Sequence, residues 1–590
     1  MLINRYNPGS MMRYLMIAAL LVLSNLTVCA QQSAEKEKEA EQRQELEKKT
    51  FALLNDIASA AWGLKLPENR VFILASAADL LWPTDEKRAR TLYWDALNSI
   101  NSVAAVTAAP GETPSKADRE KILQSYFSIF QLRQKLLQQV SRRDSQLALE
   151  MLRATRQVPP RELGPENRFA DDRQLEQQIA SEVAAHDPAQ ALQLARQSLA
   201  KGLTFELLNL LDKLNGQDSE KATQFAGEII AKLQTANVTT DFRASLIAMQ
   251  LLRESRNRSA VLSSNGSGKV LSLSDDQKRQ LVEILTSAAL SVSANSNLLA
   301  EISDMMPEID QFLPERRAAL ERKVAAFNET LPKELRDQNA QNALIRNGMP
   351  EDIIRYAATM DDRTRQMLYQ QASIIAIARG RADSFRDFIS KEVSESDRRK
   401  ILDFLDVEEI STAAGRKQLD DLRRLLPKIG RKEERARAMA ELALMLKEKS
   451  EDAEAASLLD EAATLIKTDL KDEKQTNALL TLLCAYAVID PAKAFALTER
   501  TVDRANSQIS MLMLLDKVVK SGAVKKSEII LDQGGIMPIE FLVFKYGKGV
   551  AALAKADFNR TRALADRFER NELRLLAQLL IVKGLLQSQN

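Results

Sequence analysis

The sequence predicts an all-α protein built as an irregular α-solenoid of stacked antiparallel helix hairpins. From Phe51 onward, apolar residues recur at three- and four-residue spacing, the period of an amphipathic helix, and hardly any run alternates as a strand would. Only 19 Gly and 16 Pro occur in 590 residues, so we expect few turns and long helices. A frame of apolar, Asp and Ala residues also recurs along the chain, which predicts stacked copies of one structural unit.

The repeated frame is clearest around Asp187, which can cap a helix, with Pro188 suited to the first turn of that helix. Apolar residues precede the Asp, and an Ala follows one turn after it. The copies are Ala77, Ala78, Leu81, Asp85, Ala89, Tyr93; Leu136, Leu137, Val140, Asp144, Ala148, Leu152; Ile179, Ala180, Val183, Asp187, Ala191; Leu210, Leu211, Leu214, Asp218, Ala222, Ala226; and Leu482, Leu483, Tyr486, Asp490, Ala494, Thr498.

Each copy fits a helix hairpin. The apolar pair faces inward on the first helix, the Asp caps the second helix, and the small Ala lets the two backbones approach. A single hairpin leaves one apolar side bare, so copies must stack to cover it.

A further unit resembles the tetratricopeptide class of helical repeats. Its residues are Met439, Leu442, Ala443, Leu446, Ala455, Leu459 and Ala462. The resemblance implies a helical-repeat architecture and a concave surface that holds extended partners. Anchor aspartates at 85, 144, 187, 218, 452 and 490 are unevenly spaced around the family's period, and most copies lack its glycine and proline. These departures favour an irregular solenoid over a regular peptide-binding tandem.

The first thirty residues predict a secretory signal peptide. Arg5 and Arg13 are their only charges, residues 14–23 are apolar, and small residues end at Ala30, where we expect cleavage. Two other interpretations stay open: a lipoprotein modified at Cys29, although Val28 is a poor fit before it, and an uncleaved anchor. No later stretch is long and apolar enough to cross a membrane.

After cleavage, 81 basic residues would balance 81 acidic residues, so no global field would steer the chain onto nucleic acid. Cys484 would be the only cysteine left, and no internal disulfide could form. An exported chain of this size without disulfides fits a bacterial periplasm or cell surface. The sequence does not predict an oligomeric state.

Composition divides the remaining chain into four parts. Residues 31–50 are densely charged and predict a tether or a helix start, while 51–255 and 276–590 read as two helical-repeat regions. The polar stretch 256–275, rich in Ser, Asn and Gly, predicts a flexible loop and the main boundary.

No residue pattern predicts catalysis, a cofactor or a metal. His186 is the only histidine and lies beside a predicted helix cap, and Cys484 lies in an apolar helical segment. The sequence Gly266-Ser267-Gly268-Lys269 lacks the first glycine and the final Ser or Thr of a phosphate-binding loop. The acidic doublets Asp171-Asp172 and Asp361-Asp362 stand at expected helix starts, where acids complement the helix dipole.

All three tryptophans, Trp62, Trp82 and Trp94, fall within the first hairpin region. Such a concentration fits either the core that closes one end of the array or a binding hot spot. We therefore expect an exported scaffold or binding protein for a protein or peptide partner, without catalysis, and name these tryptophans as candidate partner-binding residues. The alternative is a helical cell-wall or carbohydrate-acting enzyme that uses Asp/Glu acid-base chemistry.

Overall fold

The computed structural model describes residues 40–107, 116–155, 172–239, 241–255, 270–292, 298–302, 305–330, 341, 344–345, 348–416, 418–466, 473–519, 524–531 and 539–588. These residues are almost entirely helical, and one two-stranded hairpin is the only sheet among them. The chain is an all-α helical-repeat protein, which confirms the predicted fold class.

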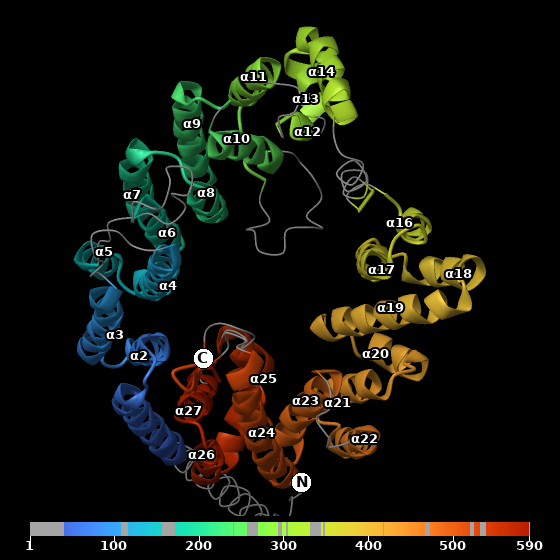
Figure 1. Ribbon diagram of the computed structural model, residues 1–590. Coiled ribbons are helices and arrows are strands. Elements are labelled where there is room, and N and C mark those ends of the chain that lie inside the picture. The colour runs from blue at the N-terminus through green and yellow to red at the C-terminus, as the bar shows by residue number, and fades with distance from the viewer. Residues whose placement is uncertain are drawn as a thin grey trace, which may run out of the picture.

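The helices are arranged in two layers around a ring (Figure 1). The first arc begins with a helix over residues 40–60. It continues through η1(Ala61–Gly63), α2(Pro67–Leu81), α3(Glu86–Thr107), α4(Lys116–Ser141), α5(Ser145–Ala154), α6(Asp172–Val183), α7(Pro188–Lys201), α8(Glu206–Gln217), α9(Ser219–Thr235), α10(Phe242–Glu254), α11(Asp275–Ser291), α12(Leu298–Ile302), α13(Met306–Phe312), η4(Pro314–Arg316) and α14(Arg317–Thr330).

The second arc returns to the start of the first. Its elements are α16(Pro350–Ala357), α17(Asp362–Ala378), α18(Ala382–Glu392), α19(Glu395–Gly415), α20(Leu419–Leu425), η5(Leu426–Lys428), α21(Lys432–Glu448), α22(Asp452–Leu465), α23(Glu473–Ile489), α24(Pro491–Val519), β1(Val524–Lys525), β2(Glu528–Ile529), α25(Ile539–Ala556), α26(Phe558–Asp566) and α27(Asn571–Gln587).

Alternate helices form the inner layer. From α2 to α10, and again from α17 to α27, each inner helix contacts the next inner helix and pairs with an outer one. Helix α27 then contacts α2, so the two ends of the described chain meet and the ring closes there. The sequence predicted stacked hairpins but not this closure.

The predicted hairpin frame is confirmed in its details. Asp144, Asp187 and Asp218 each accept a hydrogen bond from a backbone N–H in the first turn of the helix that follows. The alanines one turn later are fully buried between the paired helices: Ala89, Ala148, Ala191, Ala222 and Ala494. The small side chain therefore stands where two backbones come closest.

One copy departs from the frame. In the unit that resembles a tetratricopeptide repeat, Asp452 is the first helical residue of α22, and Glu451 precedes it without a side-chain cap. The preceding turn contains Ser450 at φ 64°, a left-handed conformation that lengthens the connection by one residue. Asp452 instead pairs with Lys447 at 2.9 Å between Nζ and Oδ2.

The predicted main boundary at 256–275 is not a boundary of the hydrophobic core. One buried cluster continues from Leu252 to Leu281 across that stretch, and it also includes residues of α25, α26 and α27. Within 270–275, Leu271 and Leu273 are buried and Ser274 caps α11 with a capping box to Gln277. Residues 256–269 of the predicted flexible loop lie outside the described residues, and the helices on either side, α10 and α11, pack together. The described core divides elsewhere, into further clusters over 353–405 and over 410–564.

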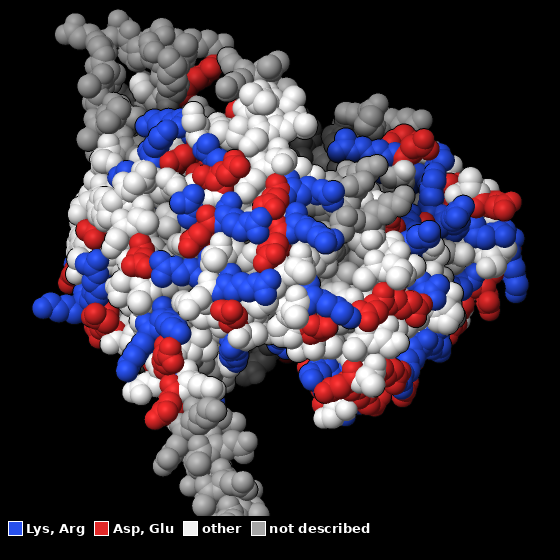
Figure 2. Space-filling view, turned by 90° about the horizontal axis from the view of Figure 1, so that it is seen from below, with Lys and Arg blue, Asp and Glu red and all other residues white. Residues whose placement is uncertain are grey.

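Ion pairs join neighbouring outer helices. On the side formed by α22, α24 and α26, basic and acidic side chains interleave rather than gather into one sign (Figure 2). The pairs are Lys493–Asp460 at 2.7 Å, Arg560–Glu499 at 2.9 Å, Arg567–Asp503 at 2.6 Å and Arg562–Asp56 at 2.8 Å. Each is exposed and contributes little alone, about 0–1 kcal/mol, but together they fix the register of one unit on the next.

No helix in the described part of the chain is both long and apolar enough to span a bilayer. The expected signal peptide and cleavage site near Ala30 lie outside the described residues, as does the sequence Gly266–Lys269.

Candidate functional site

The structure separates the three candidate tryptophans. Trp82 and Trp94 are half-buried and pack against the first hydrophobic cluster, and the rings of Trp82 and Tyr93 lie 6.0 Å apart. Trp62, in η1, remains 49% exposed, and the guanidinium carbon of Arg70 lies 5.4 Å from its ring centroid. Trp82 and Trp94 thus pack against the core with part of each side chain exposed, and Trp62 is the most exposed of the three.

Trp62 stands beside the seam where the ring closes. Helix α2 starts at Pro67, which has no N–H, and the residues before it are extended. The N–H groups of Lys65 and Leu66 therefore lie outside any helix and need acceptors from elsewhere. Those acceptors come from the opposite end of the chain.

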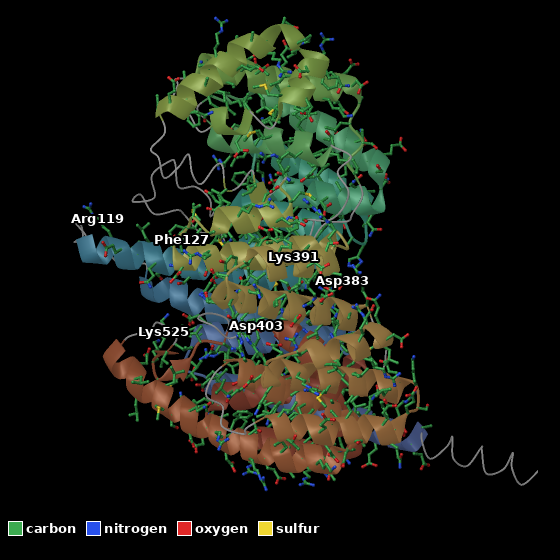
Figure 3. The ribbon with its side chains drawn as sticks, turned by 90° about the vertical axis from the view of Figure 1, so that its right-hand side faces the viewer. Arg119, Phe127, Asp383, Lys391, Asp403 and Lys525 are labelled. Atoms are coloured by element: carbon green, nitrogen blue, oxygen red, sulfur yellow. The ribbon has the colours of Figure 1, made fainter. Side chains whose placement is uncertain are left out.

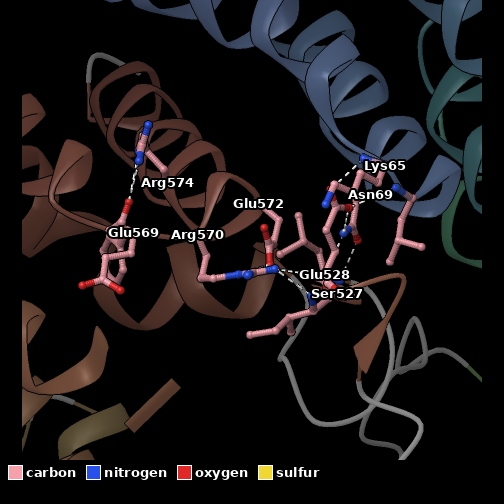
Figure 4. Close-up of polar contacts among 12 residues, drawn as sticks. Lys65, Asn69, Ser527, Glu528, Glu569, Arg570, Glu572 and Arg574 are labelled. Carbon is pink, nitrogen blue, oxygen red and sulfur yellow. Dashed lines mark hydrogen bonds and ion pairs between the residues drawn. The ribbon is translucent and has the colours of Figure 1, made fainter. Parts of the chain in front are cut away.

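The seam is held by a set of polar groups that we call the clasp (Figure 4). From the start of the chain it includes the N–H groups of Lys65 and Leu66 and the side chains of Glu68 and Asn69. From the end of the chain it includes the β1–β2 hairpin, Arg570 and Glu572. The Glu528 carboxylate accepts hydrogen bonds from Lys65 N at 2.6 Å, Leu66 N at 3.0 Å and Asn69 Nδ2 at 3.2 Å. Asn69 also donates to Ile529 O at 2.9 Å and accepts from Leu531 N at 2.9 Å. Through these two hydrogen bonds, the Asn69 side chain pairs with the backbone at one edge of the hairpin, as a neighbouring strand would.

Two more buried carboxylates complete the clasp. Glu572 accepts from Ile529 N and from Arg570 Nε, each at 3.0 Å, and Arg570 also donates to the carbonyl oxygen of Ser527. Glu68 pairs with Lys525 at 2.6 Å. Because the three carboxylates are buried, breaking any one set of hydrogen bonds would leave buried polar groups without partners.

No local pattern in the sequence could have identified this clasp. Glu528 and Lys65 are 463 residues apart. The hairpin turn is made by Lys526 and Ser527, both at positive φ, where Asn and Gly would be the usual sequence signature. The glutamates of the clasp are buried in the structure, but the sequence gives no sign of that burial.

A groove with features of a binding site lies between α5, α6 and α7. Its volume is about 340 Å³, at the lower end of the range of small-molecule sites. Leucines from α5 and α7 form its apolar wall, and charged groups of both signs line the rest. The lining residues are Leu149, Leu152, Arg153, Asp172, Glu176, Leu194, Gln197 and Lys201.

A buried arginine fixes one carboxylate of this groove. The side chain of Arg133, on α4, is 1% exposed and donates to Asp172 Oδ1 at 2.9 Å and to Thr155 Oγ1 at 3.1 Å. On the other side, Lys201 pairs with Glu176 at 2.6 Å. Arg153 has no ion-pair partner among the described residues. The groove therefore presents leucine side chains beside one guanidinium that an acidic group could pair with.

The acidic doublets occur where the sequence placed them. Asp361 caps α17 by accepting from the N–H groups of Arg363 and Thr364, and Asp172 lies in the first turn of α6. Asp171 lies outside the described residues. Both described sites are helix starts, as predicted.

Two other carboxyl groups have raised pKa values. Burial raises the pKa of Glu254 on α10, against a hydrogen bond from Gln250, and the charge of Asp212 raises it further. Burial also raises the pKa of Asp406 on α19, although Arg386 opposes that rise. A glycan hydrolase needs two carboxyl groups facing one substrate cleft. The groove between α5, α6 and α7 includes neither Glu254 nor Asp406, and its own two carboxylates, Asp172 and Glu176, are paired with Arg133 and Lys201.

His186 and Cys484 occupy structural positions. His186 lies in the exposed turn before the Asp187 cap, and its backbone N–H donates to Val183 O at 2.9 Å. Cys484, on α23, is partly buried where α23 meets α25, and its Sγ lies 3.8 Å from Tyr546 O. Within the described ranges, no three His, Cys, Asp or Glu side chains are grouped to hold a metal ion.

Comparisons with known proteins add little to this description. No protein-family model matches the sequence, and no curated protein matches it. One solved structure, described as a circular tandem repeat protein with novel repeat topology and enhanced subunit contact surfaces, is similar at 14% identity. The match covers 90% of this chain and 100% of that chain, with a TM-score of 0.16. A score this low supports no conclusion, and the helical-repeat assignment rests on the hairpins and their caps.

Proposed function

We propose that this chain is an exported helical-repeat protein that binds a peptide or an extended segment of a partner protein, without catalysis. The observation that carries the proposal is the groove between α5, α6 and α7, where Arg153 stands beside a leucine wall. A segment with an acidic residue next to apolar residues would complement both features. The buried Arg133 supports this use, because it holds Asp172 in one orientation before any partner arrives.

The exposed Trp62 supports a second contact on the partner. Its indole stacks near Arg70, and tryptophan and arginine are the residues most enriched at energetically dominant interface positions. The predicted signal peptide supports a role in a bacterial periplasm or at a cell surface.

The test is a pull-down from envelope extract with residues 31–590, followed by mass spectrometry. We expect a saturable protein partner whose recovery falls at least tenfold with Arg153→Glu, which reverses the charge in the groove, and falls severalfold with Trp62→Ala. Arg363→Glu on α17 is the matched control, because Arg363 is also exposed and also has no ion-pair partner among the described residues.

Two outcomes would contradict the proposal. One is a partner captured equally by the wild type and the Arg153→Glu variant. The other is turnover of a cell-wall glycan by the purified protein, lost on substitution of one carboxylate, which would support the enzyme alternative instead.

A further inference from the structure

The end of α24 carries a concentrated exposed apolar patch. Met511, Leu512, Leu514 and Leu515 are 64%, 41%, 63% and 55% exposed. In α24 up to Asp516, Asn506 is the last buried residue, and nothing from Ser507 to Asp516 is buried. Helix α24 contacts α23, α25 and α26, and its buried residues lie before Ser507.

The four side chains form one continuous surface. At 100° per residue, Leu514, Met511, Leu515 and Leu512 follow one another around an arc of about 160°. They expose roughly 400 Å² of apolar surface, which falls in the ~300–600 Å² range of patches that are often functional. A helix end of this kind in water is unfavourable unless something covers it.

A second copy of the chain is a poor candidate for the cover. A stable protein interface buries about 800 Å² on each partner, and the patch offers about half of that.

Basic residues lie close to the patch in the chain. Strand β1 begins five residues after α24 ends, and the side chains of Lys525 and Lys526 are exposed at the hairpin turn. Lys525 stays exposed although it pairs with Glu68. Apolar side chains with flanking lysines are the combination that binds an anionic lipid surface.

The arrangement of the ring supports the same occupant. Seen from the side, α24 ends near Lys525 and the first turns of α4 project with Arg119 in the same direction, beyond the neighbouring helices (Figure 3). Phe127, also on α4, is 40% exposed. Two projections on one face of a ring match a flat, fluid surface, which needs no shape complementarity.

We propose that this face of the ring docks on an anionic lipid bilayer, with Met511, Leu512, Leu514 and Leu515 inserted among the headgroups and Lys525 and Lys526 at the phosphates. The ring then lies face-on to the membrane. This contact is distinct from the groove between α5, α6 and α7, so it does not depend on the function proposed above.

The test is vesicle flotation with residues 31–590, which lack the apolar segment at 14–23. Phosphatidylcholine vesicles with and without phosphatidylglycerol are the probes. We expect binding to the anionic vesicles that weakens as salt rises. The triple variant Met511→Ser/Leu514→Ser/Leu515→Ser should bind at least tenfold less. Met367→Ser/Ile374→Ser on α17 is the matched control, because these side chains are 44% and 40% exposed on a different helix.

A charge variant tests the second half of the proposal. Lys526→Glu should bind anionic vesicles severalfold less and leave binding to neutral vesicles unchanged. Circular dichroism of each variant should match the wild type, because the altered side chains are exposed.

Four results would overturn the proposal: wild-type protein that floats with neither vesicle, a triple variant that floats as well as wild type, a dimer in light scattering that the triple variant abolishes, or a protein partner that the triple variant no longer binds. The third result would assign the patch to a second copy, and the fourth would assign it to that partner.

Discussion

Glu528→Ala should open the ring at its seam. The substitution removes the acceptor for three donors, the N–H groups of Lys65 and Leu66 and the Asn69 amide. A buried donor without a partner costs about 1–3 kcal/mol, but Lys65 is exposed and its N–H can regain water. Asn69 still donates to Ile529 O, so only the Leu66 N–H loses its partner in full. We therefore expect the free energy of opening at the seam to fall by about 2–4 kcal/mol.

Hydrogen exchange at the amides of Lys65 and Leu66 measures this opening directly. A change of about 2–4 kcal/mol corresponds to exchange that is roughly 30- to 1,000-fold faster. Trp62, a few residues away, provides a second readout, because its fluorescence should change at lower urea than that of the half-buried Trp82 and Trp94.

Two variants control the measurement. Glu569→Ala removes an exposed glutamate near the seam and should leave exchange unchanged. Asn69→Ala should resemble Glu528→Ala, and the double variant should be much less than additive, because both residues belong to one network. Unchanged exchange at residues 65 and 66 in Glu528→Ala would refute the conclusion that the clasp holds the ring closed.

Three further predictions concern stability. Burial acts to raise the pKa of Glu182, but hydrogen bonds and charges from α4 and α8 hold that pKa below its ordinary value of 4.5. The ionised Glu182 therefore stabilises the folded state above pH 4.5, and this stabilisation is lost as the pH falls through the pKa of Glu182 in the folded state. Glu182→Gln should thus cost about 1–3 kcal/mol near neutral pH in urea unfolding, and the difference from wild type should shrink in acid; a constant difference would contradict this. Gly549→Ala should destabilise the folded chain by about 1–3 kcal/mol in thermal unfolding, because the Cβ of the new alanine would lie 2.7 Å from the Cα of Cys484. An unchanged melting temperature would show that α23 and α25 can separate freely. Ser527→Gly should stabilise the seam by about 1 kcal/mol, because Ser527 has φ 62°, a conformation that glycine adopts more easily than serine. Slower hydrogen exchange at residues 65 and 66 would show this stabilisation, whereas faster exchange would mean that the serine side chain is needed.

The sequence predicted those parts of the fold that depend on neighbouring residues. Asp187 caps its helix and Ala191 is fully buried, because capping and close helix packing are decided within one hairpin. The turn before Asp452 is one residue longer than in the other copies, as its residue spacing indicates, but the left-handed conformation of Ser450 in that turn leaves no clear mark in the sequence.

Ring closure could not be predicted in the same way. It depends on small rotations between successive hairpins that add up over the whole chain, and no single residue encodes their sum. The groove was missed for a related reason, since Arg133 and Asp172 meet only after α4 and α6 have packed. The apolar run at the end of α24 has the composition of a buried core helix, and only the structure shows Met511 and its neighbours exposed.

The closure also has a consequence for how the chain is made. Lys65 leaves the ribosome 463 residues before Glu528. The apolar side of the first hairpin therefore stays uncovered until almost the entire chain has been made. Bringing the ends of a flexible chain of that length together would cost about 5 kcal/mol in entropy. An arc of folded hairpins avoids much of this cost, because its curvature already directs the last hairpin toward the first. Folding should therefore include a step in which α27 docks on α2, and a chain truncated before α27 should retain helices but remain prone to aggregation through its exposed first hairpin.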